Sequence, residues 1–132
     1  MALNANELFS SATRNPQGRH VWSMIQPKVI AATSGAPILA QMTPISRGAS
    51  AGDPWVVWAD AADLVGFVAD KEGIATNATD EVMGNVALSG IIHIDDIVIP
   101  AGSTLAALKT ALYTLNADNG HDWEIQGLVN VP

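Results

Sequence analysis

Short runs of β-branched residues, separated by turn-forming residues, dominate the middle of this chain of 132 residues, from Trp55 to Pro100. Such runs bounded by Gly, Asp or Ser are typical of strands, and a two-residue step containing Gly between two of them is typical of a hairpin. The sequence therefore predicts a β-rich core. The expected strands are residues 55–58, 64–69, 83–88, 91–94 and 97–99, with a hairpin turn at Ser89-Gly90.

Glycine and proline positions refine this prediction. Residues 64–69 are apolar almost throughout, which favours burial on both faces, and Gly66 within them indicates a bulge or a close backbone approach. Residues 36–46 carry Pro37 and Pro44, and proline lacks the N–H that a central strand needs. This segment is therefore expected to be an edge strand or a strap across the sheet.

One helix is predicted after the strands. Four leucines recur at spacings of three, four and three, which places them on one face of a helix. Ser103 is the expected N-cap, Gly120 suits the position just past the helix end, and residues 123–131 are expected to form a final strand. The leucines are Leu105, Leu108, Leu112 and Leu115.

The composition indicates which kinds of binding partner are expected and which are not. Only 14% of the residues are charged, against roughly 25% in a usual soluble domain, so part of the surface is expected to be covered by another protein. The net charge of −7 and the scattering of the six basic residues disfavour nucleic-acid binding. No apolar run approaches the roughly 18 residues of a membrane span, so we expect a soluble protein with no membrane partner.

The sequence offers no pattern of catalytic or metal-binding residues. Most carboxylates lie at predicted turns, where Asp is favoured for local hydrogen bonds, and none has calcium-loop spacing. His20, His93 and His121 lie in three separate segments. There is no cysteine, no nucleophile-elbow serine and no phosphate-binding glycine loop. We expect no enzyme activity, no cofactor and no metal site.

Residues 1–35 differ from the rest, because they hold three of the six basic residues and show no sustained periodicity. They could be a poorly ordered terminus, but their apolar residues favour an arm that orders on a partner. Trp55 and Trp58 are expected to point to opposite faces of a strand, one into the core and one towards a subunit contact. The candidate contact residues of the arm are Val21, Trp22, Met24, Ile25, Val29 and Ile30.

The order of these segments from about residue 36 to residue 131 resembles the family of phage lambda head decoration proteins. Trp22 and a longer leader depart from the lambda pattern. The matching landmarks are Met42-Thr43-Pro44, Val57-Trp58, the Asp-containing bend before residues 65–69, the Ser89-Gly90 turn, Asp95-Asp96, Val98-Ile99-Pro100, a helix and a closing strand.

The resemblance implies a mainly β (α+β) fold: a small β-sandwich or β-tulip-like domain over residues 36–132, with one C-terminal helix and an extended N-terminal arm over residues 1–35. It also implies a structural virion protein, present in the host cytoplasm before assembly. Family members bind as homotrimers to the outer surface of the expanded phage head and cement neighbouring subunits of the major capsid protein. By analogy, residues 21–25 and 29–32 of the arm would pair with capsid strands.

Two other classes of function remain open at this point. A tail-tube or fibre-associated β domain of a phage virion would share the low charge and the short strands. A carboxylate-metal enzyme or a sugar-binding module would use the clustered acidic residues. The oligomeric state separates the first from a decoration protein, and titration with divalent cations tests the second.

Overall fold

In a computed structural model of the chain, the described residues are 20–59, 63–118 and 123–127. They form a mainly β fold with one α-helix, which confirms the expected fold class. The elements are β1 (Val21–Ile30), β2 (Ile38–Leu39), β3 (Pro44–Ser46), β4 (Val56–Val57), β5 (Leu64–Val68), β6 (Ile74–Ala75), β7 (Val82–His93), the 3-10 turn η1 (Ile94–Asp96), α2 (Leu105–Asp118) and β8 (Trp123–Gln126).

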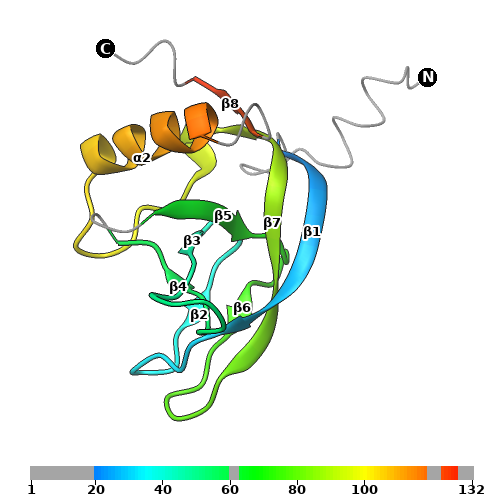
Figure 1. The fold of residues 1–132 in the computed structure, drawn as a ribbon, viewed down its shortest axis with the longest axis vertical. Helices are drawn as coiled ribbons and strands as arrows, with labels where there is room; N and C mark the ends of the chain where they lie inside the picture. The colour runs from blue at the N-terminus through cyan, green and yellow to red at the C-terminus, as the bar shows by residue number, and fades with distance from the viewer. Residues whose placement is uncertain (1–19, 60–62, 119–122, 128–132) are drawn as a thin grey trace.

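The main sheet has the strand order β1-β7-β5-β3-β4, and β8 pairs with β7 at one end. All neighbours are antiparallel except β7 and β8. The long strands β1 and β7 run side by side along one flank, α2 lies across one end of the molecule, and β2 and β6 form a separate small sheet (Figure 1). A parallel bridge between Ile30 and Trp55 joins β1 to the residue before β4, so the sheet curls back on itself at that point.

The residues around Ser89-Gly90 do not form a hairpin, because β7 is one continuous strand through this position. Gly90 has φ of 151°, and a Cβ there would collide with the backbone oxygen of Val21. The glycine is therefore required by the close approach of β1 rather than by a turn. Local pattern could not separate these two reasons, since both place glycine between two apolar runs.

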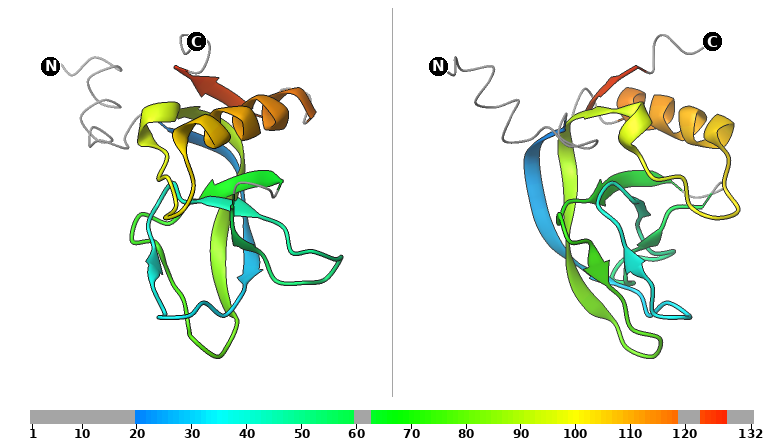
Figure 2. Two further views of the ribbon diagram at one scale, coloured as in Figure 1. Left: turned by 90° about the vertical axis from the view of Figure 1, so that its left-hand side faces the viewer. Right: turned by 180° about the vertical axis from the view of Figure 1, so that it is seen from behind.

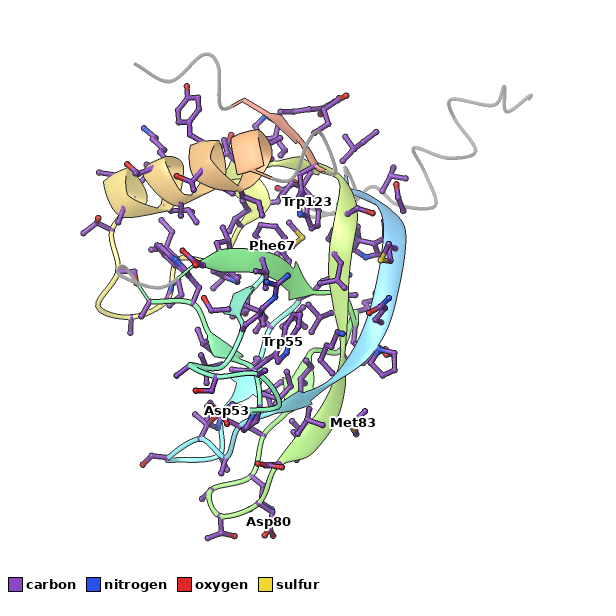
Figure 3. The ribbon with its side chains drawn as sticks, viewed as in Figure 1. Asp53, Trp55, Phe67, Asp80, Met83 and Trp123 are labelled. Carbon is purple, nitrogen blue, oxygen red and sulfur yellow. The ribbon has the colours of Figure 1, made fainter. Side chains whose placement is uncertain are left out.

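Two apolar clusters fill the fold. The larger one lies between α2 and the sheet, where the rings of Phe67 and Trp123 pack nearly perpendicular to each other with 5.1 Å between centroids (Figure 3). The smaller one lies towards the other end and is built around Ile30, Ile45 and Val86. Residues 64 and 66–69 are buried, and a Cβ on Gly66 would strike the backbone oxygen of Ala87. The burial and the close approach expected for this strand are confirmed.

The helix is confirmed, with a different first residue. Thr104, not Ser103, is the N-cap, because its hydroxyl oxygen accepts a hydrogen bond from the Ala107 N–H at 3.1 Å. Leu108, Leu112 and Leu115 are buried, whereas Leu105 at the start of α2 is exposed. Gly120 and residues 128–131 of the expected final strand lie outside the described residues.

The proline segment splits into two strands in different sheets. β2 pairs only with β6, but β3 lies between β5 and β4, so the expectation of an edge strand or strap is wrong for β3. Pro44 is the first residue of β3, where a missing N–H is tolerated. Its carbonyl accepts a hydrogen bond from the Trp58 N–H at 2.9 Å.

The folded part begins earlier than the expected boundary between residues 35 and 36. Residues 21–30 form β1 and pair with β7, so this part of the predicted arm is a strand of the domain. The signal was hidden in the sequence because β1 mixes polar and apolar residues and contains Pro27. Residues 1–19 of the predicted arm lie outside the described residues.

Candidate interaction surface

The outermost strand of the main sheet, β1, carries most of the candidate contact residues. One of its edges pairs with β7, with register shifts on either side of Met24 and a regular register from Ile25 to Ile30. The other edge faces away from β7, as two further views show (Figure 2). An edge strand of this kind presents backbone groups to a partner chain.

The C-terminal end of this outer edge is already occupied. The Trp55 N–H donates to the Val29 carbonyl at 2.7 Å, and the Ala31 N–H donates to the Trp55 carbonyl at 2.8 Å. The expected pairing of residues 29–32 with a partner strand is therefore contradicted, because these groups bond within the chain. The orientation of strand residues alternates, so Pro27 and Ile25 also turn their backbone groups to the outer edge. Pro27 has no N–H, and the available stretch of edge lies at Ile25 and before it.

The six candidate residues of β1 differ in exposure. Ile30 is 1% exposed and belongs to the smaller apolar cluster, so it is a core residue rather than a contact residue. Trp22 is half-buried, stacked on His20 at 4.3 Å and in edge contact with Trp123 at 6.3 Å between centroids. The four exposed residues are Val21 at 57%, Met24 at 46%, Ile25 at 47% and Val29 at 38%.

The two candidate tryptophans separate as the sequence predicted. Trp58 is 1% exposed and packs in the larger cluster, whereas Trp55 is partly exposed beside the smaller one. The Lys28 ammonium lies over the Trp55 ring, 4.8 Å from its centroid. The expectation that one of the two rings is a core residue is confirmed, and that residue is Trp58; a subunit contact at the other ring, Trp55, stays a prediction.

Sequence reasoning missed two features of this region. Met83 of β7 lies opposite Val29, is exposed, and points away from Trp55 (Figure 3). Lys28 and Arg47, far apart in the sequence, line one groove together with Trp55. The exposure of Met83 could have been predicted from the alternation of inward and outward residues along β7. The approach of Lys28 to Arg47 could not, because it depends on how the sheet curls.

Two titratable side chains of the described residues, those of His93 and Asp70, form local hydrogen bonds. Within the described residues, no three His, Asp or Glu side chains lie close enough to share a metal ion. His93 Nδ1 accepts a hydrogen bond from the Asp95 N–H at 3.1 Å and lies 3.6 Å from the Asp95 carboxylate, which makes it part of a helical cap. Asp70 accepts a hydrogen bond from the Asn85 side chain at 3.0 Å.

The chain matches no model of a known protein family, and a search of curated proteins gives no significant match either. Of the helical segments in the part of the chain that the structure describes, none is both long and apolar enough to cross a membrane.

Proposed function

We propose that this protein is a capsid decoration protein, which binds as a homotrimer to the outer surface of an expanded phage head and cements neighbouring subunits of the major capsid protein. The observation that carries the proposal is the exposed apolar half of β1, at an unpaired sheet edge in a chain with few charges. Exposed apolar residues beside free backbone groups are the means by which one chain adds to the sheet of another.

Some landmarks of the resemblance are neighbours in the fold, which supports the proposal, although Ser89-Gly90 lies within β7 and is not a turn. Three landmark segments far apart in the sequence meet at Met42. Its N–H donates to the Val68 carbonyl at 3.0 Å, and its carbonyl accepts from the Val98 N–H at 3.1 Å. The Val68 N–H in turn donates to the Thr43 carbonyl at 2.9 Å.

The stabilising effect follows from linkage. A protein that binds the expanded shell and not the ruptured one stabilises the shell by about 2.7 kcal/mol per site at a free concentration of a hundred times Kd. A trimer presents three copies of the binding edge at once, which raises the effective concentration of the second and third contacts. Over many sites, these contributions resist the outward pressure of packaged DNA.

In the structure, part of the predicted arm is already a folded strand, so binding would use a preformed edge as well as the residues before it. Residues 21–30 are already held by β7, so the contact at Ile25 and before it does not require ordering of a free arm. A preformed edge avoids the conformational entropy cost that ordering a free segment would add. In this proposal residues 2–19 extend the contact beyond the described strand.

The test uses decoration-free, expanded heads of the phage that encodes the protein. Light scattering should give a trimer, and sedimentation with the heads should show saturable binding at three-fold positions, checked by a density map of the decorated particle. A hexamer or polymer that does not bind heads would contradict the proposal and favour a tail-tube or fibre-associated domain.

A pair of matched variants locates the contact. Ile25→Asp should reduce head binding at least tenfold, because a carboxylate would be desolvated against the partner. Leu105→Asp, at a similarly exposed apolar residue at the start of α2, should bind like the wild type. Equal loss in both variants would show that exposed apolar surface in general, and not the β1 edge, drives binding.

A further inference from the structure

A groove runs beside the available half of β1. It has a volume of about 380 Å³, and its walls come from β1, β7, β5 and the segment that follows β3. Met24, Gln26 and Lys28 form the β1 wall, since alternate residues of a strand share one face. Arg47 and Trp55 also line this groove, and both line a second hollow of about 310 Å³.

The groove gathers cations in a strongly acidic protein. Lys28 and Arg47 are two of the four basic residues in the described part of the chain, against a net charge of −7 for the whole sequence. Neither has a carboxylate within ion-pair distance among the described residues. Asp53, at the second hollow, accepts a hydrogen bond from the Ser50 N–H at 3.0 Å and so holds its own turn. The residues that line the groove therefore include two cations and no carboxylate.

The apolar part of the groove limits the kind of anion that fits. Leu88 and Val65 also line the groove, and the Lys28 ammonium lies over the Trp55 ring. A polyanion such as nucleic acid would be repelled by the net charge of the whole molecule. A single carboxylate on a side chain with its own methylene groups could pair with Lys28 and Arg47, while its methylene groups contact the apolar lining residues.

We propose that this groove receives an Asp or Glu side chain from an extended segment of the partner protein, which pairs with the β1 edge. This inference rests on the proposed function and deepens it, because it names the chemistry of the capsid segment. A strand added beside β1 presents every second side chain to the face that holds Gln26 and Lys28. An acidic residue at the end of a segment that pairs with Ile25 and the residues before it would lie diagonal to Lys28, within reach of its long side chain, and Arg47, which lines the same groove, would supply a second cation.

The binding test compares two doubly substituted proteins of equal net charge. Lys28→Gln/Arg47→Gln removes both cations of the groove, and Lys71→Gln/Lys109→Gln removes two cations that do not line it. The groove variant should bind expanded heads roughly tenfold or more weakly, and its binding should lose most of its salt dependence. The control variant should stay within about twofold of the wild type. Urea unfolding of both variants checks that the fold is intact.

A second measurement does not need the phage head. An acetylated peptide of alternating Glu and Thr is titrated into the isotopically labelled wild-type protein, with a Gln-Thr peptide as the neutral control. Amide and indole resonances of Lys28, Arg47 and Trp55 should shift with the acidic peptide alone. The shifts should disappear in the groove variant and persist in the control variant.

The outcomes separate the two proposals. Wild-type binding to heads with equal affinity for the two double variants would overturn the carboxylate site and leave the decoration function standing. No binding of the wild type to heads would overturn the decoration function, and the peptide titration would then decide the site alone. Shifts confined to the groove would support it, and their absence would overturn it.

Discussion

Both halves of β1 pair with β7 along one edge, but their other edges differ. In the C-terminal half, Trp55 takes up the outer backbone groups of Val29 and Ala31, and Ile30 is buried. In the N-terminal half, the register with β7 shifts on either side of Met24, and Val21, Met24 and Ile25 are exposed. One strand thus combines a closed, structural half with an open half that has the properties of a binding edge.

The difference shows that apolar character alone does not separate core from contact. Ile25 and Ile30 are the same residue type five positions apart on one strand, yet they differ from 47% to 1% in exposure. Side chains alternate along a strand, so Ile25 and Ile30 lie on opposite faces of β1, and Ile30 lies on the face that packs into the smaller cluster. This division of β1 can be tested by removing the strand, by substituting a residue in each half, and by altering the residue of β7 that contacts the start of the strand.

The largest effect is expected from removal of the whole strand. Deletion of residues 2–35 should abolish cooperative unfolding, because it strips β7 of its partner and removes buried Ile30. Deletion of residues 2–19 should leave a cooperative transition, since it removes none of the described strands. Thermal unfolding followed by circular dichroism measures both. A cooperative transition for the longer deletion would show that β1 is an appendage and not part of the domain.

The next effect compares one substitution at the two ends of β1. Ile30→Ala should lower the free energy of unfolding by about 2–5 kcal/mol, the range for truncating a buried isoleucine. Ile25→Ala should change it by less than about 1 kcal/mol, because the side chain is already half in water. Urea unfolding at equilibrium measures both, and equal losses would contradict the division of the strand.

The smallest effect is expected at the contact between β7 and the start of β1. Gly90→Ala should lower the free energy of unfolding by about 1–3 kcal/mol, since φ of 151° and the Val21 oxygen both exclude a Cβ. Gly35→Ala is the control, because it has a positive φ of 82° but no heavy atom within 4 Å of the new Cβ. If the two variants lost the same amount, backbone strain alone would explain both, and the approach of Val21 would contribute nothing.

The elements that the sequence predicted correctly are those determined by the spacing and type of nearby residues. The leucine stripe of α2 and the apolar run of β5 follow from spacing and composition, so both were expected correctly. The N-cap moved by one residue because Ser103 and Thr104 are both good caps, and only the geometry of the turn selects Thr104. That β7 continues unbroken through Gly90 could not be predicted from local pattern. The glycine is required by the backbone oxygen of Val21, which lies 69 residues earlier in the chain.

The candidate surface was predictable in part. The exposed residues of β1 were identified because apolar residues in a weakly patterned segment indicate a contact. The core role of Ile30 could not be found in this way, since it depends on a bridge to Trp55, 25 residues later. The groove depends on the same bridge, because it places Trp55 beside Lys28.

Pro27 has a consequence for the protein at high concentration. The outer edge of β1 lacks a donor at its centre, so two copies cannot zip their edges into an uninterrupted ladder across this position. The proline thereby acts as a stop against self-propagating aggregation while the residues before it stay open. Without such a stop, the exposed apolar residues of β1 would offer a longer uninterrupted edge for pairing between copies.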